Sequence, residues 1–142
     1  MMKTILLLVA AVALIMIGWH LRPTSTPTPV PTPNPAPLMD IIVTDPQPGQ
    51  VISSPLTVSG QARGTWFFEA SAPIKVLDSA GHVIGQSHIE ATGEWMTDQL
   101  VFFTGSVSFT QATGTGSVVF MNDNPSGDPV RDKSFTVPIT FQ

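Results

Sequence analysis

Short runs of alternating apolar and polar residues, separated by turn-forming residues, fill the chain from residue 40 to its end. This part contains no convincing helical repeat, and alternation with a period of two is typical of strands that bury one face. The runs that we expect to form strands are 40–44, 51–62, 73–79, 82–91, 99–110, 114–123 and 133–142. Their number and spacing predict an all-β fold, an immunoglobulin-like antiparallel β-sandwich of about seven strands.

Three aromatic residues stand side by side in the segment "RGTWFFEA": Trp66, Phe67 and Phe68. If this segment is extended, the first and third rings point one way, while the second ring and Glu69 point the other. We expect Phe68 to lie in the core together with either Trp66 or Phe67, and the remaining ring to be partly exposed. The alternative is that the three rings together form a platform for a carbohydrate or a peptide.

Residues 1–38 do not show the apolar–polar alternation of the rest of the chain. Residues 4–21 are almost wholly apolar and follow Lys3, so we expect residues 1–22 to form an uncleaved signal anchor with one transmembrane helix. Cleavage after Ala13 or Gly18 is the alternative. Residues 23–38 are rich in proline and threonine, which predicts an extended polyproline II linker, and residues 39–142 form the sandwich domain.

Charge and composition exclude several classes of function. All ten acidic residues lie in 39–142 against four basic ones, a net charge of 4 − 10 = −6. A surface of this sign repels phosphate, so we expect no nucleic-acid partner. The chain has no cysteine, which excludes disulfides and thiolate chemistry, and no grouping typical of a catalytic triad or phosphate loop stands out. We therefore expect no enzyme activity and no cofactor.

Several motifs resemble a known family. The run "SSPLTVSGQARGTWFFEA", the later "GEWMTDQLVFF" and the turn "NDNPSGDP" are similar to those of the immunoglobulin-like domain of bacterial spore germination proteins. The resemblance spans roughly residues 41–141. It implies an immunoglobulin-like fold outside the cytoplasmic membrane and a role in adhesion or protein interaction. It implies no catalytic residue, and the bare anchor and linker of this chain differ from the multidomain spore proteins.

Two groups of residues are candidates for a site. The first is a set of large or charged residues beside turns, which we expect to form an interaction surface: Arg63, Trp66, Phe67, Glu69 and Trp95. Trp95 is equally compatible with a ring that closes the end of the core. The second is a weak calcium candidate in the loop "MNDNPSGDPVRD", namely Asp123, Asp128 and Asp132, whose composition also suits a plain turn.

Together these features predict a non-catalytic module anchored in the cytoplasmic membrane through residues 4–21, with its domain facing the periplasm or the cell exterior. The expected partner is an envelope protein or polymer. The alternative function is a carbohydrate-binding or cell-wall-binding module that uses the Trp66–Phe68 rings.

Overall fold

The computed structural model describes residues 39–142, and the predicted anchor and linker lie outside these residues. Within 39–142 the structure is built almost entirely of strands. The elements are β1 (Ile41–Asp45), β2 (Val51–Ile52), β3 (Leu56–Arg63), η1 (Gly64–Trp66), β4 (Ser71–Leu77), β5 (Val83–Ala91), β6 (Leu100–Val107), β7 (Gly114–Met121), η2 (Pro129–Arg131) and β8 (Ser134–Phe141). In this part of the chain no helix is long and apolar enough to cross a membrane.

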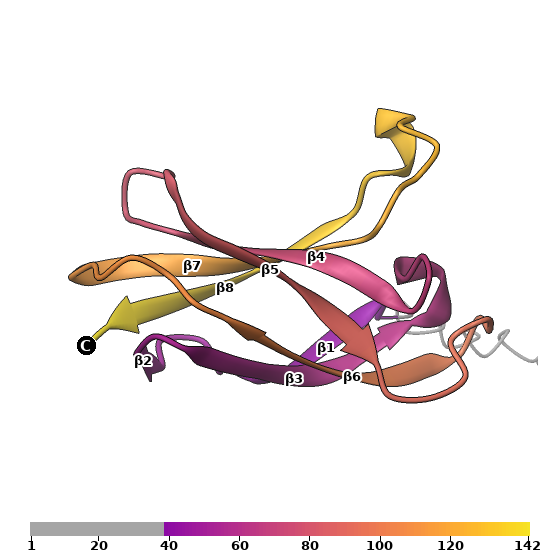
Figure 1. The fold of residues 1–142 in the computed structure, drawn as a ribbon, viewed down its shortest axis with the longest axis horizontal. Coiled ribbons are helices and arrows are strands. Elements are labelled where there is room, and N and C mark those ends of the chain that lie inside the picture. The colour runs from indigo at the N-terminus through magenta and orange to yellow at the C-terminus, as the bar shows by residue number, and fades with distance from the viewer. Residues whose placement is uncertain (1–38) are drawn as a thin grey trace, which may run out of the picture. The chain divides into compact units, whose positions relative to one another are not determined.

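The strands form two layers that are joined through β5. The hydrogen-bonded order is β1-β3-β6-β5-β4-β7-β8-β2, and all pairs are antiparallel except β2 with β8. β5 pairs along most of its length with β4 and, near its end, with β6. Figure 1 shows it passing from the layer of β4, β7 and β8 toward the layer of β1, β3 and β6. The predicted all-β sandwich is confirmed, with its two layers linked into one continuous sheet.

The structure has eight strands because the run predicted for 51–62 is divided. β2 ends at Ile52 and β3 begins at Leu56, with Pro55 between them. Proline has no N–H for a ladder hydrogen bond, so the chain can change partners here. β2 pairs with β8 in one layer, and β3 pairs with β1 and β6 in the other.

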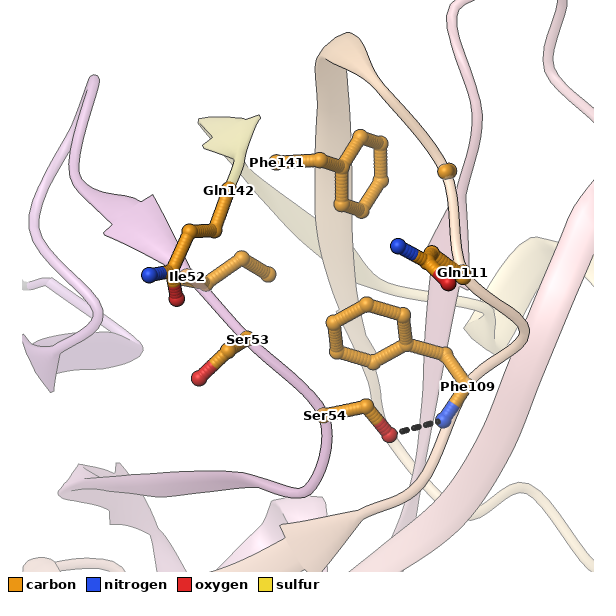
Figure 2. A pocket seen from close by; sticks show the side chains of 8 residues that line it. Ile52, Ser53, Ser54, Phe109, Gln111, Phe141 and Gln142 are labelled. Carbon is orange, nitrogen blue, oxygen red and sulfur yellow. Dashed lines mark hydrogen bonds between the residues drawn. The ribbon is translucent and has the colours of Figure 1, made fainter.

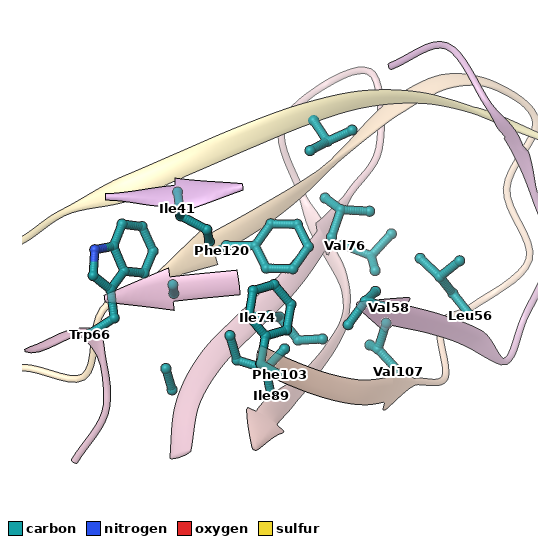
Figure 3. Close-up of a cluster of buried hydrophobic side chains, with 14 of the residues drawn as sticks. Ile41, Leu56, Val58, Trp66, Ile74, Val76, Ile89, Phe103, Val107 and Phe120 are labelled. Carbon is teal, nitrogen blue, oxygen red and sulfur yellow. The ribbon is translucent and has the colours of Figure 1, made fainter. Parts of the chain in front are cut away.

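The core lies between the two layers and is wholly apolar among the described residues. Phe120 of β7 and Phe103 of β6 meet at its centre, with ring centroids 5.8 Å apart (Figure 3). The alternation predicted for the last strand is confirmed for Val137, Ile139 and Phe141, which are all buried. Phe135, at the start of β8, is 36 % exposed.

The sandwich has two ends, which we name by the residues found there. At the Met39 end lie the start of β1, the segment 63–70 and the loops 92–99 and 122–133. At the Gln142 end lie the connections 53–55, 78–82 and 108–113 and the end of β8. Figure 1 shows the C-terminus and the β4–β5, β6–β7 and β2–β3 connections at one end. All the candidate residues predicted from the sequence lie at the Met39 end.

Candidate interaction surface

The three adjacent rings are not arranged as predicted. Trp66 and Phe67 are buried, 2 % and 4 % exposed, whereas Phe68 is 44 % exposed. The prediction that Phe68 is the core ring is therefore wrong. The reason is that the segment is not extended: residues 64–66 form a 3₁₀ turn, and Glu69 and Ala70 have positive φ values of 50° and 63°. The side chains therefore do not alternate as they would in a strand.

Burial removes two residues from the predicted interaction surface. The rings of Trp66 and Phe67 pack in the core, so they are not available to a partner, and the three rings do not form a surface platform. Figure 3 shows Trp66 beside Ile41 at the edge of the core. Its indole Nε1 is buried without a hydrogen-bond partner among the described residues. Glu69 remains exposed, on the tight turn in which Phe68 and Ser71 exchange two backbone hydrogen bonds of 3.0 Å.

The loop 92–99 is packed against the 3₁₀ turn. A Cβ atom at Gly64 would collide with the carbonyl oxygens of Trp95 and Thr97, so only glycine allows this close approach. The Gly64 N–H donates to the Gln99 carbonyl at 3.1 Å, and Arg63 Nη1 donates to the Asp98 carbonyl at 2.6 Å. Trp95 is half-buried against the core, in agreement with the alternative in which its ring closes the end of the sandwich.

Arg63 also belongs to a charged group that links the two layers. Its Nε lies 3.2 Å from one Asp40 carboxylate oxygen, and Lys133 Nζ donates to the other at 2.7 Å. The hydrogen bond from Lys133, aided by the charges of Lys133 and Arg63, holds the pKa of Asp40 below its usual value. Arg63 therefore has structural partners on two sides and is only partly exposed.

The acidic loop has the hydrogen bonds of a turn. The Asp128 carboxylate accepts from the Val130 N–H at 3.1 Å and caps η2. The Asn124 side-chain amide donates to Asp132 Oδ1 at 2.7 Å and to the Asp128 carbonyl at 2.8 Å. Among residues 39–142 no group of three acidic or histidine side chains is close enough to share a metal ion. The Asp128 and Asp132 carboxylates thus accept hydrogen bonds from within the loop, as the side chains of a plain turn do.

A different set of residues forms an apolar band on the outer face of the β1–β3–β6 layer. Phe102 is 65 % exposed, Ile42 38 % and Leu100 37 %. Ile42 lies opposite Gln61, which in turn lies opposite Phe102, and Leu100 lies opposite Arg63. We call Ile42, Leu100 and Phe102 the β6 patch. A hollow of about 380 Å³, formed with the loop 92–99, adjoins Leu100 and Phe102.

At the Gln142 end the layers part around a hollow of about 360 Å³. Its lining residues are Ile52, Ser53, Ser54, Phe109, Gln111, Ala112, Phe141 and Gln142. The rings of Phe109 and Phe141 lie 5.6 Å apart and are tilted by 55°. Figure 2 shows both rings on one side of the hollow, with Ile52 across from them. The Phe109 N–H donates to Ser54 Oγ at 2.9 Å, which fixes the β6–β7 connection to the β2–β3 connection.

In one layer β1 pairs with β3, and in the other β2 pairs with β8. This strand order defines an immunoglobulin-like β-sandwich. The chain belongs to the family described as the immunoglobulin-like domain of bacterial spore germination, whose model matches residues 40–128. The resemblance seen in the sequence is confirmed. No curated protein and no solved structure matches the chain significantly.

Proposed function

We propose that the chain is a non-catalytic module of the bacterial cell envelope that binds another protein through the β6 patch. Residues 4–21 would anchor it in the cytoplasmic membrane, and residues 23–38 would separate the anchor from the domain on the extracytoplasmic side. The observation that carries the proposal is the exposed apolar band of Ile42, Leu100 and Phe102.

The location of the band distinguishes it from scattered surface residues. Single exposed apolar side chains are common on soluble proteins, but adjoining ones on a sheet face indicate a contact surface. Phe102 and Leu100 are two positions apart on one strand, so they lie about 7 Å apart on the same face. Ile42 is two strands away across Gln61, at about 10 Å.

The remaining outward residues of this sheet face are polar, as in the rim of a protein interface. The outward positions farther along β3 and β6 carry hydroxyls: Thr57, Ser59, Thr104 and Ser106. Interfaces commonly have an apolar centre with an aromatic anchor and a polar rim that can hydrate or hydrogen-bond. Phe102, as the most exposed ring of the domain, is the expected anchor. The net charge of −6 favours a partner that is not itself strongly acidic.

The test is site-specific crosslinking of the full chain in intact cells. A photoreactive phenylalanine analogue at position 102 should give a discrete adduct with one envelope protein. The same analogue at Thr136, exposed on the outer face of β8 in the other layer, is the matched control and should give none. Phe102→Ser should remove the interaction while changing the free energy of unfolding by less than about 0.5 kcal/mol, because the ring is largely exposed.

Two results would contradict the proposal. An equal yield of the same adduct from positions 102 and 136 would mean that the β6 patch has no special role. An adduct of twice the chain's own mass as the sole product would assign the patch to self-association instead of a different protein.

A further inference from the structure

We infer that the hollow at the Gln142 end is a binding site for a neutral sugar ring. The site is distinct from the β6 patch and does not depend on it, because its residues come from the opposite end of the sandwich. Phe109 and Phe141 would contact the apolar face of the sugar, and Ser53, Ser54 and Gln111 would hydrogen-bond its hydroxyls.

The arrangement of polar and apolar groups supports this ligand class. Ile52 and Phe141 are buried at the base of the hollow, and Phe109 is half-buried beside them. Ser53 and Gln111 are exposed at the rim. A pyranose has an apolar C–H face and a hydroxylated edge, so an aromatic base with a hydroxyl and amide rim is complementary to both.

Charge disfavours an anionic ligand. None of the described residues that line the hollow has an ionisable side chain. An anionic ligand that entered it would lose hydration without gaining an opposite charge, which is unfavourable. A hydroxyl both donates and accepts hydrogen bonds, and so do serine and glutamine side chains. The volume of about 360 Å³ is within the range of small-ligand sites and is sufficient for a single sugar unit of a longer glycan.

The test is an NMR titration of the isotope-labelled full chain with N-acetylchitotriose and with maltotriose, in a zwitterionic detergent whose headgroup contains no sugar. Such a detergent keeps the apolar segment 4–21 in solution without competing for the site. At least one of the two trisaccharides should shift the side-chain amide of Gln111 and the backbone amide of Phe109. Phe109→Ala should weaken this binding about tenfold through the lost ring contact. Phe68→Ala, which removes an exposed ring at the Met39 end, should leave it unchanged.

Because Phe109→Ala could also perturb the fold, a second pair of variants tests the site by changing only exposed side chains. Gln111→Ala removes only an exposed amide and should weaken binding about threefold to tenfold. Gln86→Ala removes an exposed amide from β5 and should have no effect. The inference is overturned if neither trisaccharide shifts the Gln111 amide. It is also overturned if the shifts lie at the β6 patch, or if an aromatic tripeptide binds the hollow while both sugars fail.

Discussion

The two ends of the sandwich differ in how they use their polar and aromatic residues. At the Met39 end several of these residues have structural roles: Trp66 is buried in the core, Arg63 contacts Asp40 and Asp98, and Asp128 caps a 3₁₀ turn. At the Gln142 end, the rim residues Ser53 and Gln111 are exposed around two phenylalanine rings. Tryptophan, arginine and aspartate residues therefore stabilise the Met39 end, whereas serine, glutamine and phenylalanine residues line the hollow at the other end.

This difference shows why residue type alone was a poor guide to the site. A tryptophan or an aspartate beside a turn suggests a contact surface, but at the Met39 end three long connections must be fixed to one another. The Asp123 N–H donates to the Trp66 carbonyl at 2.8 Å, and Gly64 is in close contact with the loop 92–99. The large residues of this end close the core beneath those connections.

The largest effect is expected when the buried ring of the Met39 end is removed. Trp66→Ala should lower the free energy of unfolding by about 3–5 kcal/mol, because it leaves a cavity where the core meets the loops. Denaturant unfolding followed by circular dichroism measures this change. Trp66→Phe should cost markedly less, since it also removes an indole N–H that is buried without a partner. A Trp66→Ala variant as stable as the parent would place the ring at the surface and reverse the comparison of the two ends.

Close backbone packing can be compared directly at both ends by adding one methyl group. A Cβ at Gly64 meets the Trp95 and Thr97 carbonyls, and a Cβ at Gly116 meets the Phe141 ring and the Leu77 carbonyl. Each alanine variant should lose about 1–3 kcal/mol of stability.

Gly93→Ala is the matched control for this pair, because a Cβ there has no atom within 4 Å. It should change the stability by less than about 0.5 kcal/mol. Gly116→Ala should in addition weaken sugar binding by displacing Phe141, whereas Gly64→Ala should not. Equal loss of sugar affinity in both variants would show that the two ends are not independent.

An intermediate effect is expected at Phe68, the ring whose position was predicted wrongly. It is 44 % exposed, so Phe68→Ala should cost about 1 kcal/mol, well below the cost of Phe67→Ala in the core. Thermal unfolding of the two variants under one set of conditions makes the comparison. If Phe68→Ala cost more than Phe67→Ala, Phe68 would be the core ring, as first predicted.

The fold itself was predictable because its signal is periodic. The alternation in β8 and the turn clusters between runs are properties of neighbouring residues, and a two-residue period identifies the buried face without further information. The same alternation in "LVFF" would have assigned Phe102 to the outer face once Val101 and Phe103 were assigned to the core. The sequence therefore contained a signal for the β6 patch.

The hollow and the aromatic segment could not be predicted in the same way. The lining residues come from two separate connections, the end of β2 and the end of β8, and only the strand order brings them together. The turn at Glu69 and Ala70 has positive φ without glycine or asparagine, so the usual turn signals are absent. Tertiary contacts, which are not local in sequence, determine both features.

Neutralising a single carboxylate is expected to change the stability less than the substitutions above. The lowered pKa of Asp40 means that its contribution to stability is present above about pH 4 and is lost as the pH falls through the pKa of the folded state. Asp40→Asn should therefore cost at most about 0.5 kcal/mol at neutral pH, since the group is partly exposed, and progressively less as the pH falls below about 4.

Asp78, at the Gln142 end, is the matched carboxylate. Its pKa is also lowered, chiefly by the hydrogen bond from the His82 backbone N–H. Molar salt should diminish the effect of Asp40→Asn, whose partners are the Lys133 and Arg63 charges, more than that of Asp78→Asn. Denaturant midpoints of the two variants at low and high salt provide the measurement. Equal salt dependence would mean that the charges of the Met39 end contribute no more than backbone hydrogen bonds do.

The smallest expected effect is that of calcium on the acidic loop. Asp128 already caps a backbone N–H and Asp132 accepts from Asn124, so a calcium ion would have to replace these hydrogen bonds before it gained ligands. The melting temperature of the full chain should therefore be the same in excess calcium and in excess chelator. A ligand that binds only the folded state raises the melting temperature, so a rise that Asp128→Asn abolished would identify a site at Asp123, Asp128 and Asp132. In that case the Met39 end would bind an ion as well as fixing its own loops, and the contrast between the two ends would be weaker.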